Sequence, residues 1–491
     1  MRHSAVGARI ARAFVVVAAV LAPAGCAVGP DYARPSVIVT DGYKEAEGWK
    51  PARPRDEIPR GAWWEIFADP ELSALESRVS VSNQNLAVAE AQFREARALV
   101  REARAALFPQ ITAGVGVSRS RSSGNVPITV GGPPGARSNY TLPLDVSWEL
   151  DVWGRIRRQV ESNRAAAQAS AGDLETARLS VQAELAQDYF ELRTLDAQKQ
   201  LLEATAAVYQ ETLTLTQNRY ASGVVSRADV LQAETQLRST EAQAIDVGVQ
   251  RAQLEHAIAL LIGQPPAAFS LAEAPLAGEP PGIPAGLPSE LLERRPDIAA
   301  AERRVAAANA AIGVAKAAYY PTVTLSASAG FQSSSPAQWL VWPSRFWSVG
   351  PNVSETVFDG GLRGALTDQA RAAYDASVAA YRQAVLTAFQ SVEDNLAALR
   401  ILEDEARTQD AAVKAARQSV IVTTNQYKAG TVSYLSVITV QAIALANETT
   451  AVQILGRRMT AAGLLIQALG GGWNVDELPS AREVTTPARR S

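Results

Sequence analysis

Residues 218–234 read NRYASGVVSRADVLQAE, and about 207 residues later residues 425–441 read NQYKAGTVSYLSVITVQ. In each stretch a glycine, Gly223 or Gly430, follows a long helical pattern, and a serine three residues later precedes another. Glycine accepts the positive φ that ends a helix, and a serine hydroxyl can satisfy free N–H groups where the next helix begins. We therefore predict that the chain forms the same helical hairpin twice.

The composition excludes several classes of function. The 491 residues carry a net charge of −3, and the charges are scattered, so the chain has no basic patch of the kind that binds nucleic acid. Its single cysteine and two histidines, His3 and His256, exclude an intrachain disulfide and a Cys/His metal cluster. No nucleophile–base set or phosphate-binding loop is apparent. We expect no enzymatic activity, no metal and no cofactor.

The N-terminus resembles a secretory signal. Residues 1–25 combine a basic start with a short apolar run, Ala13–Ala22, that is too short to span a bilayer. Small residues then precede the only cysteine, Cys26, as in a bacterial lipoprotein box, although Pro23 stands where such boxes usually carry Leu. We predict lipidation of Cys26; the alternative is an ordinary signal cleaved near Ala24. Residues 26–60, rich in Pro and Gly, are predicted to form an extended arm.

The rest of the chain divides into two repeats with one plan. The plan is a helix, two strands and a long helical hairpin. We predict a first repeat over 61–265, with strands 108–120 and 140–152, and a second over 289–472, with strands 321–332 and 347–358. A Pro/Gly-rich linker, 266–288, joins the repeats, and 473–491 is predicted to be a flexible tail. Within the first repeat, the pattern predicts one helix over 72–107.

Each predicted strand alternates apolar and polar residues. In the second, Leu142, Leu144 and Val146 share one face, and Asp145 and Ser147 share the other. Strands of 10 to 13 residues can cross a bilayer when tilted, but the smallest membrane barrels need eight strands, and an open edge in lipid leaves backbone groups unpaired. Four strands therefore predict a barrel completed by other copies of the chain. The alternative is a small soluble sandwich with a coiled coil.

The two longest helical patterns each cover roughly 67 residues, about 100 Å at the α-helical rise. Such a helix does not fit within a compact domain, so it must pack along its length against neighbouring helices.

At this point the chain is similar, nearly end to end, to the TolC/OprM-type outer-membrane efflux proteins of the NodT-like lipoprotein branch. The motifs that carry the resemblance are Cys26, Trp63-Trp64 before Asp69-Pro70, Trp153-Gly154-Arg155 matched by Phe358-Asp359-Gly360-Gly361, Arg294 to Ile298 through Tyr320-Pro321, and Ala468 to Trp473.

The resemblance implies a mixed α and β fold. In a homotrimer, four strands per protomer form a twelve-stranded outer-membrane β-barrel that is continuous with a long periplasmic α-helical barrel. It also implies a lipid-anchored protein of the Gram-negative outer membrane, extending into the periplasm. The implied function is the exit channel of a tripartite efflux pump, which passively conducts small molecules expelled by an RND-type inner-membrane transporter through a periplasmic adaptor.

The resemblance also assigns roles to the paired turns. The implied pore constriction is Val432, Ser433, Tyr434, Leu435, Ser436 and Thr439. The implied adaptor-contacting turns contain Gly223, Val224, Ser226, Arg227, Asp229, Gly430 and Thr431. Family members often carry aspartates at the positions of Ser436 or Thr439, so this chain is expected to have a less charged constriction.

Two alternative functions remain open from the sequence. The same fold would serve as the conduit of a type I protein secretion system. A structural coiled-coil lipoprotein of the envelope is the alternative from a different class, and the amphipathic strands argue against it.

Overall fold

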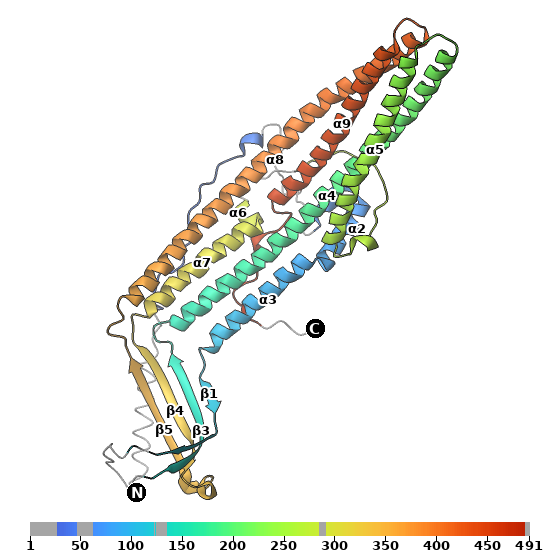
Figure 1. Ribbon diagram of the computed structural model, residues 1–491. Helices are drawn as coiled ribbons and strands as arrows, with labels where there is room; N and C mark the ends of the chain where they lie inside the picture. Colours follow the sequence, from blue (N-terminus) through green and yellow to red (C-terminus); the bar gives the residue numbers. More distant parts are fainter. Residues whose placement is uncertain (1–26, 47–61, 122, 124–134, 284–290, 487–491) are drawn as a thin grey trace.

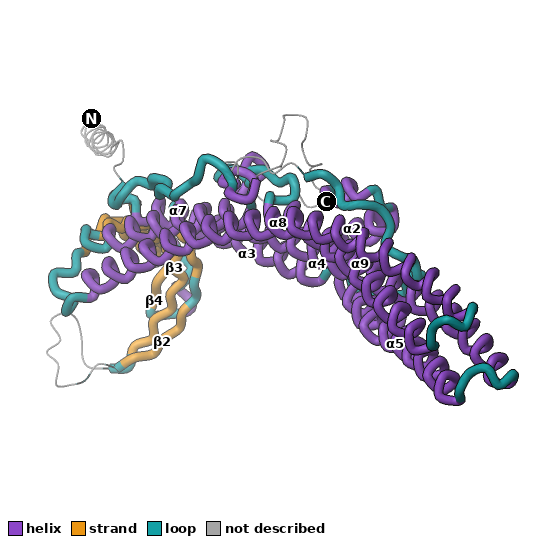
Figure 2. Tube along the Cα trace, turned by 90° about the horizontal axis from the view of Figure 1, so that it is seen from above, coloured by secondary structure: helices purple, strands orange, loops and turns teal. Residues whose placement is uncertain are grey.

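The computed structural model describes residues 27–46, 62–121, 123, 135–283 and 291–486. The molecule is long and narrow: a small β-sheet lies at one end, and helices run from it to a pair of turns at the other end (Figure 1). In the perpendicular view, the strands project at an angle from the helical body (Figure 2). The predicted signal and the lipidation site Cys26 lie outside the described residues.

The sheet is antiparallel throughout and joins strands from both repeats. Its order is β1-β3-β4-β5, and β2 pairs with β3 beyond the end of β1. The strands are β1 (Gln110–Ala113), β2 (Gly116–Ser120), β3 (Arg137–Leu150), β4 (Thr322–Ser333) and β5 (Arg345–Ser354). Two strand lines from each repeat therefore lie side by side.

The strand predicted over 108–120 is interrupted between β1 and β2. The break faces Pro143, which has no N–H to donate to a ladder; across it, Gly114 N donates to Pro143 O at 3.0 Å. The register is the same on both sides, because Ile111 faces Val146 and Val117 faces Tyr140. The alternation of faces therefore survives the interruption.

The last strand also differs from its predicted bounds of 347–358. It begins at Arg345 and ends at Ser354, which pairs with Thr322, the first residue of β4. Residues 355–358 have no partner strand beyond this pair, so they leave the sheet.

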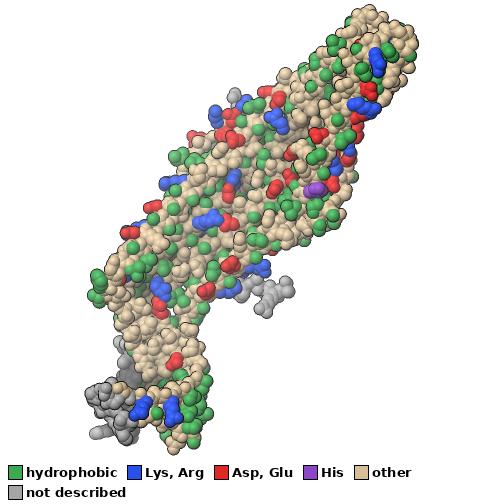
Figure 3. Space-filling model, in the orientation of Figure 1, with side chains coloured by type: hydrophobic (Ala, Val, Ile, Leu, Met, Phe, Trp, Pro, Cys, Tyr) green, Lys and Arg blue, Asp and Glu red, His purple; other side chains and the backbone are tan. Residues whose placement is uncertain are grey.

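One face of the sheet is apolar and the other is polar. The registered pairs Leu144 with Ala329 and Ala329 with Trp347 place apolar side chains from three strands in one row. Trp347 and Val349 are 78% and 60% exposed, and hydrophobic side chains gather along one side of the sheet in Figure 3. The opposite face carries Asp145, Ser147, Thr324, Ser326, Ser328, Ser348 and Asn352. This arrangement suits a wall between lipid and water.

The helices of the two repeats match in length. The longest are α4 (Arg155–Ala221) and α8 (Leu362–Lys428), each of 67 residues. They return as α5 (Arg227–Leu261) and α9 (Tyr434–Ala468), each of 35 residues. The remaining α-helices of the described chain are α2 (Pro70–Ser82), α3 (Gln84–Ala105), α6 (Leu291–Arg294) and α7 (Pro296–Ala317). Gly154 and Gly361, at φ 79° and 94°, begin the longest helices.

The helix predicted over 72–107 is broken at Asn83. Asn83 has an extended backbone, and its Oδ1 accepts from Asn85 N and Leu86 N, so it caps α3. Its Nδ2 donates to Leu261 O at 2.8 Å, at the C-terminal end of α5. One side chain therefore joins the end of α5 to the start of α3, and Gly263 fits so closely that an added Cβ would lie 2.2 Å from Ser82 O.

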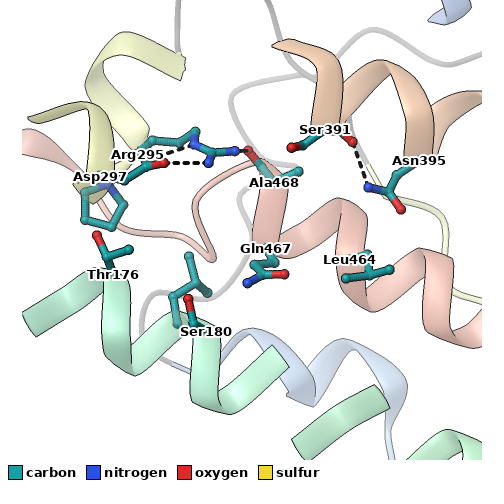
Figure 4. Close-up of a pocket in the computed structure, with 11 residues that line it drawn as sticks. Thr176, Ser180, Arg295, Asp297, Ser391, Asn395, Leu464, Gln467 and Ala468 are labelled. Carbon is teal, nitrogen blue, oxygen red and sulfur yellow. Dashed lines mark hydrogen bonds and ion pairs between the residues drawn. The ribbon is translucent and has the colours of Figure 1, made fainter. Parts of the chain in front are cut away.

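The second repeat has an equivalent junction, between α9 and α7 (Figure 4). Arg295 Nη1 donates to Ala468 O at 2.8 Å, and the same guanidinium pairs with Asp297. Gly470 repeats the close approach of Gly263, since an added Cβ would lie 1.9 Å from Arg294 O. A cavity of about 200 Å³ lies beside this junction, between α4, α7, α8 and α9. In each repeat, two separate helices are thus joined end to end, α5 to α3 in the first and α9 to α7 in the second.

The largest core cluster includes residues of α2 and of helices from both repeats. Trp63 is buried there, its indole N–H donates to Gln182 Oε1 at 3.3 Å, and its ring meets Trp64 edge-on. Asp69 caps α2 and accepts a hydrogen bond of 2.7 Å from Tyr189. These contacts explain the Trp-Trp and Asp-Pro motif physically: it fixes α2 against α4.

The described part of the linker, 266–283, is held by a network of charges. Asp196, almost fully buried, pairs with Arg193 at 3.1 Å and with Arg251 at 2.7 Å. The two guanidiniums donate to Ala272 O and Leu271 O, and Asp196 accepts from Ala274 N. The linker is therefore fastened to α4 and α5.

Both ends of the described chain lie against the helices. The arm packs on α7 and α8: Tyr32 hydrogen-bonds Glu302, and Glu393 accepts from Lys44 N and Glu45 N. The tail, predicted to be flexible, instead packs on α3 and α4 through residue 486. Val484 is fully buried, and Gln168 donates to Pro479 O at 2.9 Å. The burial of Val484, an apolar residue in a mostly polar segment, holds the tail against the helices. The polar composition of the segment gave no sign of this contact.

Candidate functional site

The paired turns lie together at the end of the molecule farthest from the sheet (Figure 1). Gly223 and Gly430 adopt φ of 72° and 79°, as the turn pattern predicted. The residue after each glycine donates five residues back, Val224 N to Arg219 O at 2.9 Å and Thr431 N to Gln426 O at 3.0 Å. Both turns therefore end their helices with the same hydrogen-bonded geometry, a Schellman motif.

The helix starts after the two turns differ. Ser226 and Asp229 form a reciprocal capping box: Ser226 N donates to Asp229 Oδ2 at 2.9 Å, and Asp229 N donates to Ser226 Oγ at 3.3 Å. Ser433 makes no side-chain cap, and its hydroxyl lies 3.5 Å from that of Ser436. The side chain of Ser433 therefore satisfies none of the first N–H groups of α9, and only its backbone carbonyl accepts, from Ser436 N at 3.2 Å.

A small hydrophobic cluster holds the tip together. It buries Tyr209, Leu213, Ala233, Leu237, Tyr427, Tyr434 and Val437, from all four hairpin helices, with Val432 packed against it. Tyr434 is only 2% exposed, and its ring lies 5.5 Å from that of Tyr427. Tyr434 was expected at the constriction, but it is buried within the protomer because its side chain packs into this cluster of both hairpins. Burial raises the pKa of its phenol.

Arg219 connects the two hairpins, a role that was not assigned from the sequence. Its Nη1 donates to Tyr427 O at 2.7 Å, at the end of α8, and its guanidinium lies 4.6 Å from the centre of the Tyr427 ring. Thr216 and Tyr427 hydroxyls approach to 3.5 Å. A cation at a helix C-terminus is favourable. The sequence did offer one sign of this role, because the second repeat has Gln426 at the position of Arg219.

The other predicted site residues are mostly on the surface of the tip. Val224 and Leu435 are 61% and 59% exposed. Gly223, Ser226, Arg227, Gly430, Thr431, Ser433 and Thr439 are also exposed, and Asp229, Val432 and Ser436 are half-buried. Leu435 and Thr439 lie one turn apart on α9, where Thr439 Oγ1 donates to Leu435 O. These two side chains are therefore available to a neighbouring surface or a pore.

The described residues offer no metal site. They contain no group of three or more His, Cys, Asp or Glu side chains that could hold a metal. His256 is exposed on α5. By length and composition alone, α9 is the one described helix that could span a membrane. It packs alongside α8, away from the sheet.

The sheet is amphipathic, and it is joined to helices of 67 residues that end in tight turns. These features define a class of protein, an outer-membrane channel with a long helical body. The chain matches the Outer membrane efflux protein family over residues 75–264 and 287–471. The chain belongs to this family.

Three similar proteins specify the relationship. The pyoverdine export outer membrane protein OpmQ of Pseudomonas aeruginosa is 32% identical over 425 residues, which cover 86% of this chain and 89% of OpmQ. The toluene efflux pump outer membrane protein TtgC of Pseudomonas putida is 31% identical, covering 91% and 93%. The solved outer-membrane channel OprN matches with a TM-score of 0.85 at 32% identity, covering 91% and 100%. The similar proteins are channel proteins, and this chain is an outer-membrane efflux channel.

Proposed function

We propose that three copies of this chain form one conduit. Three sheets give a twelve-stranded barrel in the outer membrane, and the helices form a periplasmic tunnel. The observation that carries this proposal is the sheet: its apolar face is exposed, its other face is polar, and β5 and the β1/β2 line each present an open edge. Because an open edge cannot remain in lipid, the edges must pair with those of other copies.

Cross-linking at the edges tests the oligomer. The only native cysteine is Cys26, so Thr112→Cys combined in turn with Ser348→Cys, Gly350→Cys and Asn352→Cys reports contacts between copies. At least one pair should give a ladder that ends at three. A ladder beyond three, or none from any pair, contradicts a closed trimer. Thr112→Cys with Ser326→Cys, on the central strand β4, is the matched control and should not link copies.

The proposed conduit works passively within a tripartite pump. An inner-membrane transporter of the RND type supplies the cargo, and a periplasmic adaptor docks on the exposed tip turns at Val224, Arg227 and Thr431. The names of two similar proteins refer to pyoverdine export and to toluene efflux. Both compounds are small molecules, which favours small-molecule efflux over protein secretion. The conduit needs no enzymatic activity. Lipidation of Cys26, outside the described residues, anchors it further.

The proposed constriction consists of the exposed residues Ser433, Leu435 and Thr439 of the second tip and the half-buried Val432 and Ser436. Hydroxyl and apolar side chains there would narrow the pore without a ring of carboxylates. Leu435→Ala and Thr439→Ala should each raise single-channel conductance in planar bilayers. Unchanged conductance in both variants would contradict a constriction at these residues. The cross-linking experiment above tests the trimeric channel separately.

A further inference from the structure

A cavity between α3, α4 and the C-terminal tail is lined by three arginines. Arg104 comes from the last turn of α3, Arg164 from α4 and Arg482 from the tail. The remaining lining residues are Ala481, Thr485 and Thr486, and the volume is about 470 Å³. The packed tail therefore brings a third guanidinium and two hydroxyls to a groove that two helices alone would leave open.

The cationic groups of this cavity lack carboxylate partners within the described residues. Arg164 Nε donates to Thr485 Oγ1 at 3.3 Å. The guanidiniums of Arg104 and Arg482 make no hydrogen bond or ion pair there. Neighbouring arginines near the sheet are neutralised: Arg155 pairs with Glu149 at 2.8 Å, and Arg157 pairs with Asp151 at 3.1 Å. The arginines of this cavity therefore differ from these two neighbours in having no carboxylate partner within the described residues.

The nearest carboxylate in sequence faces elsewhere. Glu483 accepts from Ser480 N at 2.8 Å, which keeps its pKa low, and it lines the adjoining cavity rather than this one. The hydroxyls of Thr485 and Thr486 already donate to Ala481 O and Arg482 O. The three guanidiniums, with no carboxylate among the lining residues, match the chemistry of a phosphate group, since guanidinium offers paired donors to its oxygens.

The cavity lies close to the membrane. Aromatic side chains mark the junction of helices and sheet: Phe108 is exposed, Trp148 Nε1 donates to Leu107 O at 3.0 Å, and Trp153 stacks on Tyr320. Such aromatics sit at membrane interfaces. Arg104 precedes Phe108 by four residues, and Leu107 N and Phe108 N donate to Arg104 O and Ala105 O, so a tight turn joins the end of α3 to Phe108. Each headgroup layer is roughly 5–7 Å thick. A headgroup is thus within reach of the guanidiniums.

We propose that this cavity binds the phosphate of an anionic phospholipid from the periplasmic leaflet of the outer membrane. The three arginines hold the phosphate oxygens, and the acyl chains extend past Phe108 along the apolar face of the sheet. The tail, by supplying Arg482, completes the site.

The test measures phospholipid retained by the purified, full-length channel. Native mass spectrometry counts the phosphatidylglycerol bound per chain after detergent washing. Arg104→Gln with Arg482→Gln should weaken retention on the order of tenfold, because each arginine near an anionic headgroup contributes attraction. Arg94→Gln, an exposed arginine on the same helix outside the cavity, is the matched control and should retain lipid like the native chain.

Three outcomes contradict the proposal. Equal retention by the double variant and the native chain removes the site. Full displacement of the lipid by millimolar inorganic phosphate reassigns the cavity to a free anion. Loss of the oligomer with unchanged lipid per chain reassigns the arginines to contacts between copies. Arg482→Gln alone keeps the test informative if the double variant fails to fold, since this tail side chain makes no hydrogen bond or ion pair within the described residues.

Discussion

The two hairpin turns share one backbone and differ in what stabilises it. Both glycines have a positive φ and both helices close with the same hydrogen bonds. The first turn holds itself through the Ser226–Asp229 capping box. The second lacks a cap but places Tyr434 in a cluster shared by both hairpins. The first tip is therefore locally stabilised, whereas the second depends on its neighbour.

The largest difference should come from replacing Tyr434. Tyr434→Ala removes a buried ring from the tip cluster and should cost about 3–4 kcal/mol of local stability. Arg227→Ala, at the equivalent exposed position of the first turn, should cost almost nothing. Hydrogen exchange of the tip helices measures both. Similar exchange in the two variants would show that the tips are not stabilised differently.

Arg219 should produce the next largest effect. Arg219→Ala loses a charged hydrogen bond to Tyr427 O and a contact with its ring, and should weaken the link between hairpins by about 2 kcal/mol. We expect a more frequently open channel in bilayers. Gln426→Ala, the equivalent position in the second repeat, should leave opening unchanged. If both variants behave alike, the link does not depend on Arg219.

The caps should show a smaller difference. Ser226→Ala breaks the capping box and should destabilise the start of α5 by about 1 kcal/mol. Ser433→Ala should destabilise the start of α9 by only about 0.3 kcal/mol, since the Ser433 side chain makes no cap hydrogen bond. Amide exchange in the first turns of α5 and α9 checks this prediction. A larger effect at Ser433 would reverse the comparison.

The smallest effect is a gain. Ser436 occupies the position of Asp229, so Ser436→Asp should allow a capping box with Ser433 and stabilise the start of α9 by about 0.5 kcal/mol. Slower exchange at the first amides of α9 is the expected result. Ser436→Asn, which is similar in size and uncharged, separates capping from the effect of charge, and faster exchange in the aspartate variant would contradict the prediction.

Regular features of this fold could be predicted from the sequence. Alternation marked the two faces of the sheet, and glycines marked the ends of helices, because both effects depend on neighbouring residues. The break at Asn83 could not be predicted in this way, because it depends on a hydrogen bond to Leu261, far along the chain. The burial of Val484 in the tail likewise depends on a groove between α3 and α4.

The tip shows the same division. The glycine and serine pattern predicted the turns correctly. The family resemblance implied that Tyr434 lines the pore, but Tyr434 is buried in the tip cluster. Whether a side chain in a helix faces a lumen or a neighbouring hairpin depends on packing that no local pattern encodes. Arg219 was missed because its partner is a backbone carbonyl, and carbonyls carry no residue-specific signal.

The helix junctions at Asn83 and Arg295 have a mechanical consequence. Each hairpin combines one unbroken helix, α4 or α8, with one column that is joined across the gap by side chains rather than by a continuous backbone. A bending load is therefore carried by the unbroken helix, and the compliance is concentrated at one level of the molecule. Bending of either hairpin is therefore expected at this level, between the sheet and the tip.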